Sequence, residues 1–272
     1  MQGRGTLVGL DRDGEMIEHA KRRFREEGVP EGCVRWIVGS YGELTRLLAE
    51  AGIRTYDGIL FDLGLNTLQL SDADRGFSFH ADGPLDARFS REEPIPTLGE
   101  RLARISQERL EQVLRDWGNE RWARRIARAI LRRREREPIR TTGDLAAIVR
   151  RAVPPVRGRR RIDAATRTFQ ALRMLVNEEL EHLERGLEQA IAGLGPSGKI
   201  VVISFHSGED RIVKTVFRRH DARRQGQGED NGTTEGPRLE VLTRKPVRPG
   251  ESECQSNPSA RSARLRAAVR AA

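Results

Sequence analysis

The chain has 272 residues, of which 33% are charged and 37% hydrophobic, as in a soluble globular protein rather than a disordered one. Its 49 lysines and arginines outnumber 40 acidic residues, a formal net charge of +9 that favours nucleic acid as a partner, although solvated basic faces would give the same balance. The two cysteines, Cys33 and Cys254, argue against a disulfide framework and a zinc site, and they suit the cytoplasm. No apolar run is long enough to span a bilayer, and the first residues lack the apolar core of a signal peptide.

The first part of the chain alternates between two patterns. Short apolar runs at residues 6–10, 34–38 and 58–61 predict strands, and residues 13–27 and 42–51 predict helices between them. Strands that alternate with helices are joined by right-handed crossovers and form a parallel sheet. The expected fold class is therefore α/β.

The pattern changes in the middle of the chain. Residues 71–161 contain no convincing buried strand but a Gly/Pro/Asp-rich loop at 82–86, followed by arginine-rich sequence with apolar residues at helical spacing. We therefore expect an α/β domain in two parts, residues 1–71 and 166–272, with a helical insert at 72–165.

The α/β pattern returns after the insert. Apolar residues from Phe169 to Ile191 recur at three- and four-residue spacing and predict one long helix, ended by Gly193. Residues 199–205 predict a buried strand, and Ser207 with Asp210 resembles a capping box for the next helix. A polar, glycine-rich loop is expected at 226–236, and the last strands at 238–243 and 263–269.

Polar residues lie at the ends of the first three predicted strands. Asp11 ends the first strand, where an acid in a doubly wound fold accepts hydrogen bonds from ribose hydroxyls, although it could instead cap the next helix. Asp62 ends the third strand and is followed by Gly64, which permits close approach of the backbone. Tyr41 follows the second strand and could lie against a flat ring or belong to the core.

Histidine and arginine provide candidate contacts to phosphate. His206 lies at a strand end beside a helix N-terminus, where it could contact phosphate or substrate, although a lone histidine is more often structural. Two basic groups match a phosphate backbone, or else form solvated faces. The first group lies along one side of a predicted helix and consists of Arg121, Arg125, Arg128 and Arg132. The second group consists of Arg159 and Arg160.

Taken together, several segments resemble the RsmH/MraW family. They occur in family order over essentially the whole chain, at residues 75–79, 82–86, 165–173, 202–207, 209–214, 242–246 and 257–263. The resemblance implies a Rossmann-like methyltransferase domain, dependent on S-adenosylmethionine (SAM), with a helical substrate domain inserted into it. It also implies a substrate, the exocyclic N4 of a cytosine in the decoding region of small-subunit (16S) rRNA within the 30S particle.

The resemblance assigns roles to individual residues. Asp11 would bind the ribose hydroxyls of SAM, Tyr41 would pack on its adenine, and Asp62 and Gln69 would complete the cofactor contacts. Methylation of cytosine N4 requires acceptors for its N–H groups and an in-line methyl group, which places Asp62 and Asn66 near N4 as catalytic candidates. No metal is required.

The chain also departs from the family pattern. The family has a first strand and a glycine-rich loop before the segment that matches residues 6–11, and neither is present in this sequence. We therefore expect Met1 to be a late start choice in a longer gene. Residues 65–68 also differ from the family pattern. Two alternatives stay open, a catalytically degenerate RNA- or ribosome-binding relative and a nicotinamide-dependent oxidoreductase, the latter without a G-x-G-x-x-G motif.

Overall fold

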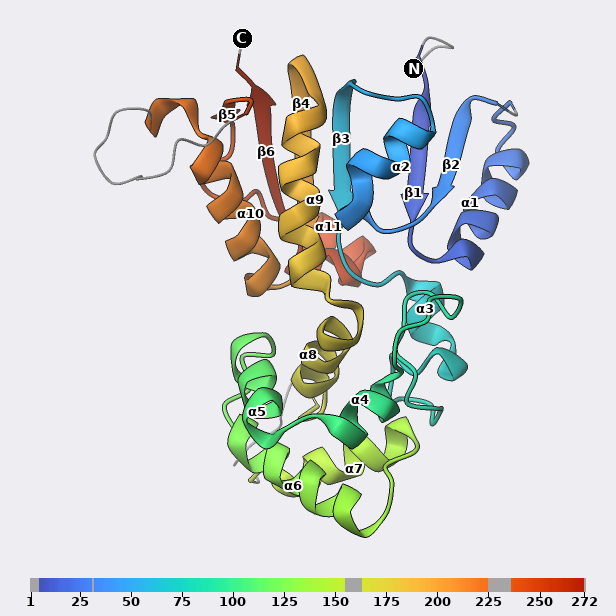
Figure 1. Ribbon diagram of the computed structural model, residues 1–272, viewed down its shortest axis with the longest axis vertical. Coiled ribbons are helices and arrows are strands. Elements are labelled where there is room, and N and C mark those ends of the chain that lie inside the picture. Colours follow the sequence, from blue (N-terminus) through green and yellow to red (C-terminus); the bar gives the residue numbers. More distant parts are fainter. Residues whose placement is uncertain (1–4, 31, 155–162, 225–235, 272) are drawn as a thin grey trace. The chain divides into compact units, whose positions relative to one another are not determined.

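The chain folds into two compact units, seen in a computed structural model that describes residues 5–30, 32–154, 163–224 and 236–271 (Figure 1). The first, called here the sheet unit, consists of Met1–Gly64 and Leu180–Ala272. The second, the helical unit, consists of Leu65–Glu179.

The sheet unit begins with a parallel pair of strands. β1 spans Leu7–Asp11 and β2 spans Val34–Val38, and the register places Asp11 opposite Val38. Helix α1, Gly14–Glu26, connects the two strands. After β2, the 3-10 helix η1 and the helix α2 follow, at Tyr41–Glu43 and Leu44–Glu50. The crossover that the alternating pattern predicts is confirmed.

The other strands of the sheet unit form a mixed sheet in the order β3-β4-β6-β5. Their bounds are Tyr56–Asp62 for β3, Leu194–Ser204 for β4, Leu239–Val241 for β5 and Arg264–Arg270 for β6. β3 and β4 are parallel, whereas β6 is antiparallel to both of its neighbours. The sheet is therefore mixed rather than wholly parallel, because the chain returns beside β4 in the opposite direction.

Helices pack against β4 to form the core of the sheet unit (Figure 1). α9 spans Glu179–Gly193 and α10 spans Ser207–His220. Leu187 of α9, Val202 of β4 and Val216 of α10 are fully buried members of one cluster. Burial of each such side chain contributes about 1.5–3 kcal/mol. Three short helices complete the unit: η3 at Ala222–Arg224, α11 at Glu251–Ser256 and η4 at Pro258–Ser262.

The helical unit contains no strand among its described residues. Its elements are α3 Thr67–Ser71, η2 Ala73–Arg75, α4 Leu98–Arg104, α5 Gln107–Asp116, α6 Ala123–Arg136, α7 Thr142–Ala152 and α8 Thr166–Asn177. The predicted apolar faces of α5 and α6 are confirmed, because Leu110, Leu114, Ile126 and Ile130 are fully buried in one cluster with Leu172 of α8.

The prediction of one long helix from Phe169 to Ile191 is wrong. The chain forms two helices, α8 and α9, which meet at Glu178 in the left-handed conformation (φ 52°). Buried Asn177 explains the break, since its side-chain amide donates to Ala87 O and accepts from Phe89 N, both 2.8 Å away. These contacts hold Asn177 against a distant loop, which helical periodicity cannot indicate.

The bounds of the sheet unit and the helical unit differ from the predicted division at residues 71 and 165. The helical unit begins at Leu65 and also includes α8, so the sheet unit resumes only at Leu180. The predicted loop at 226–236 lies outside the described residues except for Gly236. Among the described residues, no helix combines the length and the hydropathy of a membrane-spanning segment.

Candidate functional site

The carboxyl ends of β1 and β2 lie side by side in the sheet unit. Gly39 N donates to Asp11 O over 2.8 Å, which joins the residue after β2 to the last residue of β1. The side chain of Asp11 contacts the loop that follows β1, where its Oδ1 accepts from Asp13 N over 2.8 Å. Asp13 caps α1 by accepting from Glu15 N over 3.1 Å, and it is buried. The cap that Asp11 could have provided is therefore provided by Asp13.

Tyr41 is held at the same edge by a well-defined turn. Ser40 caps η1, and its hydroxyl accepts from Gly42 N over 3.1 Å. The ring of Tyr41 meets Phe61 of β3 edge to face, with 5.5 Å between ring centroids and 75° between planes. This contact connects the turn after β2 with the residue that precedes Asp62.

Helix α9 supports the Tyr41 turn from behind. Gln189 Nε2 donates to Gly42 O over 2.8 Å, and Gln189 Oε1 accepts from Thr45 N over 2.7 Å. Gly186 permits this approach, because a Cβ at that position would lie 2.8 Å from Tyr41 O. Gln189 was not among the predicted site residues, since nothing local indicates which turn a polar residue on an amphipathic helix will reach.

Asp62 lies at the end of β3 near a buried carboxylate. Glu209 at the start of α10 is only 3% exposed, and its Oε2 accepts from Phe205 N over 2.9 Å. Desolvation by the surrounding atoms and the nearby Glu209 carboxylate raise the pKa of Asp62, although the residue as a whole is exposed. Asp62 is therefore a stronger proton acceptor, when ionised, than an ordinary aspartate. Glu209 was not among the predicted site residues.

His206 takes a structural position. Its Nδ1 accepts from Gly208 N at 3.1 Å and Glu209 N at 3.3 Å, which places the ring hydrogen on Nε2, 3.0 Å from Glu209 Oε1. Glu209 Oε2 in turn accepts from His206 N over 3.4 Å, so the two residues form the capping box of α10. The predicted box of Ser207 with Asp210 is wrong, because Asp210 instead pairs with Arg266 of β6 over 2.6 Å. The predicted phosphate contact of His206 stays a prediction.

Asn66 and Gln69 belong to the helical unit, where they cap α3 together. Asn66 Oδ1 accepts from Gln69 N over 2.8 Å, and Gln69 Oε1 accepts from Asn66 N over 3.3 Å. Gln69 is buried. The structure therefore brings these two predicted residues together and gives both a local role, while Asp11, Tyr41 and Asp62 are held in the sheet unit.

The predicted arginine stripe lies along α6 and just before it. Arg121, Arg125, Arg128 and Arg132 are all exposed. None of them forms an ion pair with a residue in the described ranges, and Arg121 lies over the Trp122 ring, 5.2 Å from its centroid. On the opposite face of α6, Ile126 and Ile130 are buried. Arg159 and Arg160 lie outside the described residues. Within those ranges, no cluster of three metal-ligating side chains occurs.

Comparisons with known proteins give one consistent result. A family model described as the MraW methylase family matches residues 1–271. The "Ribosomal RNA small subunit methyltransferase H" of Trichlorobacter lovleyi is 43% identical over 97% of this chain and 84% of the relative. Its namesakes in Geobacter sulfurreducens and Syntrophotalea carbinolica are 45% and 46% identical, over 97% of this chain and 84% and 83% of the relatives.

Proposed function

The chain belongs to the MraW methylase family, and we propose that it transfers a methyl group from SAM to the exocyclic N4 of a cytosine in the decoding region of small-subunit rRNA. The observation that supports this proposal is that Asp11 and Asp62 end β1 and β3 and Tyr41 follows β2, in a chain that matches the family over residues 1–271. The names of the relatives do not favour a catalytically degenerate RNA-binding protein.

The chemistry of the strand ends suits the adenosine part of SAM. Asp11 provides a carboxylate, which accepts hydrogen bonds from ribose hydroxyls. The Tyr41 ring provides an apolar surface for a purine, and Phe61 and Gln189 hold its turn in place. When bound, SAM supplies the electrophilic methyl group. We propose that Asp11 and Tyr41 hold its adenosine part.

Asp62 is our candidate for the group that prepares cytosine N4. The lone pair of this nitrogen is delocalised into the ring, so it becomes a better nucleophile only as its N–H hydrogen is drawn toward an acceptor. The raised pKa of Asp62 makes its carboxylate a better acceptor of that hydrogen. Glu209, fixed by Phe205 N, keeps a second negative charge nearby and so acts through Asp62. In this proposal Asp62 is the catalytic residue and Glu209 a positioning residue.

The helical unit supplies the remaining candidate contacts. We propose that Asn66 contacts the cytosine and Gln69 the cofactor. Their capping box would hold both side chains in fixed rotamers. We propose that the exposed arginines of α6 neutralise phosphates of the rRNA within the 30S particle, and that Arg159 and Arg160, which lie outside the described residues, also contact phosphate. With these partners, the protein would act in the cytoplasm.

The finer description of the fold belongs to the same proposal. Within the described residues, β1 pairs only with β2, and β3 only with β4. Leu60 in the middle of β3 is 62% exposed, which is unusual for an apolar residue of a parallel strand. We propose that a further strand and the family's glycine-rich loop belong beside β1 and β3. We also propose that the helical insert, expected at 72–165, interrupts a methyltransferase domain formed by 1–71 and 166–272.

The test is nucleoside mass spectrometry of small-subunit rRNA from a strain in which the native gene is deleted. N4-methylcytidine should be lost in the deletion strain and restored by the wild-type gene. Asp62→Asn should not restore it, whereas Asp57→Asn, an exposed residue near the start of the same strand, should. Retention of N4-methylcytidine in the deletion strain would refute the proposed function.

A further inference from the structure

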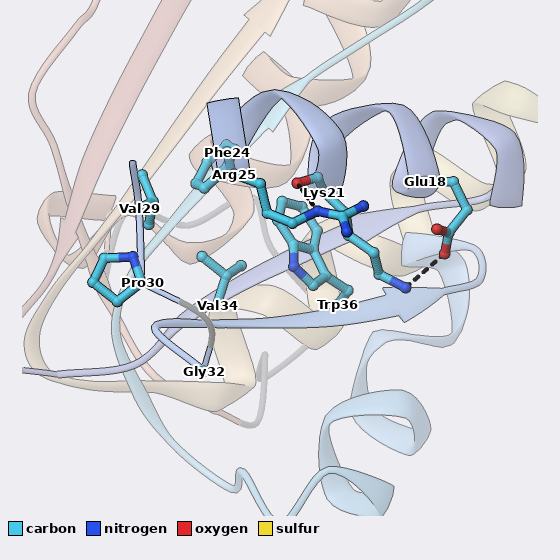
Figure 2. A pocket seen from close by; sticks show the side chains of 9 residues that line it. All are labelled: Glu18, Lys21, Phe24, Arg25, Val29, Pro30, Gly32, Val34 and Trp36. Carbon is cyan, nitrogen blue, oxygen red and sulfur yellow. Dashed lines mark hydrogen bonds and ion pairs between the residues drawn. The ribbon is translucent and has the colours of Figure 1, made fainter. Parts of the chain in front are cut away.

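The sheet unit has a pocket away from the strand ends just described. It has a volume of about 370 Å³ and lies between the last turns of α1, the loop that follows and the first residues of β2 (Figure 2). α1 begins beside Asp11 and runs back along the strands, so its last turns lie near Val34 and not near Val38. The pocket is therefore at the amino end of β1 and β2, opposite the proposed SAM site.

Two aromatic rings shape the pocket. Trp36 of β2 lies across Gly9 of β1, where an added Cβ would be only 2.5 Å from the indole ring. Phe24 of α1 meets Trp36 edge to face, with 5.2 Å between centroids. Val29 and Val34 extend the apolar wall. Because Gly9 has no side chain, the indole lies flat on the strand pair and its outer parts line the pocket.

Two cations stand at the rim of this apolar wall. Lys21 and Arg25 are one helical turn apart on α1 and project on the side where Trp36 lies (Figure 2). Lys21 pairs with Glu18 over 2.7 Å, but both side chains are exposed, at 37% and 61%. An exposed pair of this kind contributes about 0–1 kcal/mol, so Lys21 can exchange Glu18 for a phosphate.

A pocket that has aromatic and apolar residues in its wall and cations at its rim suits an unstacked nucleotide. An unstacked nucleotide of single-stranded RNA has a flat, largely apolar base and a flanking phosphate on each side. The volume is near the lower end of the roughly 300–1,000 Å³ of small-ligand pockets, which suits one nucleotide.

We infer that this pocket is a second RNA-binding site, which takes one unpaired nucleotide of the substrate RNA against the parts of Trp36 and Val34 that line it, with its phosphates on Lys21 and Arg25. The inference rests on the proposed rRNA substrate and adds an anchoring point for it. Because the pocket is at the opposite end of the strands from Asp11 and Asp62, it sets the affinity for RNA and not the rate of methyl transfer.

The first experiment uses Trp36 as its own reporter. In a Trp117→Phe/Trp122→Phe variant of the chain, Trp36 is the one remaining tryptophan. Single-stranded oligouridylate should quench its fluorescence, whereas duplex RNA, whose bases are stacked and paired, should not. If that variant does not fold, the wild-type chain and a Trp36→Phe variant are compared instead. The difference in RNA-induced quenching between them reports the same contact. No quenching of Trp36 by single-stranded RNA overturns the inference.

The second experiment separates the pocket from general charge. Lys21→Gln/Arg25→Gln removes the two rim cations, and Arg22→Gln/Arg23→Gln removes two exposed cations of the same helix that do not line the pocket. The first pair should lower the salt dependence of binding to single-stranded RNA by about 1.4 in the log–log slope, from about 0.7 per phosphate contact. The control pair should lower it by much less. Equal changes in both pairs overturn the inference.

A third measurement distinguishes failure of the pocket from failure of the proposed function. Trp36→Leu should raise KM for the rRNA substrate roughly fivefold or more, as expected for loss of one base–aromatic contact, and leave kcat and SAM affinity unchanged. Methyl transfer with an unchanged KM would overturn the pocket and leave the methyltransferase assignment intact.

Discussion

The strands of the sheet unit and the helices α4 to α8 of the helical unit differ in how completely they bury their apolar side chains. In the helical unit, Leu110, Leu145 and Leu172 are fully buried, and the exposed large apolar residues, Leu68 and Leu70, belong to the short α3. In the sheet unit, Leu60 of β3 is 62% exposed and Val38 at the end of β2 is 51% exposed, although α9, α10 and β4 share a buried core. A helix satisfies its backbone hydrogen bonds internally, so a bundle can close by side-chain packing, whereas a strand needs a neighbour at each edge. The exposed apolar residues of the strands, Val38 and Leu60, therefore lie in the unit that carries Asp11, Tyr41 and Asp62.

The largest expected effect is on the core of the helical unit. Leu172→Ala should lower the free energy of unfolding by about 2–5 kcal/mol, because it leaves a cavity among fully buried side chains. Leu60→Ala in β3 should change it by no more than about 0.5 kcal/mol. Urea denaturation of both variants measures the contrast. Equal losses of unfolding free energy in the two variants would show that Leu60 is buried in solution. The two units would then not differ in the burial of these apolar side chains.

The second prediction concerns the exposed arginines of the helical unit. Replacement of Arg125, Arg128 and Arg132 by glutamine should weaken rRNA binding roughly tenfold or more and lower its salt dependence by about 2 in the log–log slope. The melting temperature should hardly change, because these side chains form no ion pairs with described residues. Filter binding over a salt series measures the slope. An unchanged slope would show that these arginines form a solvated face and do not contact phosphates of the RNA.

The third prediction tests the support of the Tyr41 turn. Gln189→Leu removes two hydrogen bonds, each worth about 1 kcal/mol, and should weaken SAM binding roughly tenfold. Gln189→Glu keeps the acceptor for Thr45 N and should lose less. Calorimetric titration of the native protein with SAM measures both, with circular dichroism to verify the fold. Wild-type affinity in Gln189→Leu would separate this turn from the cofactor.

The smallest expected effect is the destabilisation of the folded protein by the ionised Asp62 side chain. Because the pKa of Asp62 is raised in the folded state, the unfolded chain loses this proton first as pH rises. Wild-type stability should therefore fall from about pH 4, the ordinary pKa of aspartate, up through the folded-state pKa. Asp62→Asn should lack this decrease and be the more stable protein at neutral pH.

Thermal unfolding at several pH values measures this difference, which should disappear below the ordinary pKa of aspartate. A variant that is less stable than the wild type at neutral pH would show that ionised Asp62 is stabilised in the folded state. In that case the carboxylate would not be the destabilised acceptor of the proposed mechanism.

Most of the elements, and three of the candidate site residues, follow from local patterns in the sequence. Short apolar runs predicted β1, β2 and the end of β3, so Asp11, Tyr41 and Asp62 could be found as the residues that end or follow them. These features are local: a strand's side chains alternate in burial, and parallel strands place their carboxyl ends at one edge.

Other features depend on distant segments that only the folded chain brings together. The break between α8 and α9 depends on hydrogen bonds from Asn177 to a loop 88 and 90 residues earlier in the chain. His206 is the N-cap of α10, and Asp210, which was expected to cap this helix with Ser207, forms an ion pair with Arg266 of β6 instead. Trp36 lines a pocket because Gly9 lies beneath it on the neighbouring strand. Each outcome depends on a hydrogen bond or a close packing contact between residues far apart in sequence, which local propensity and periodicity do not encode.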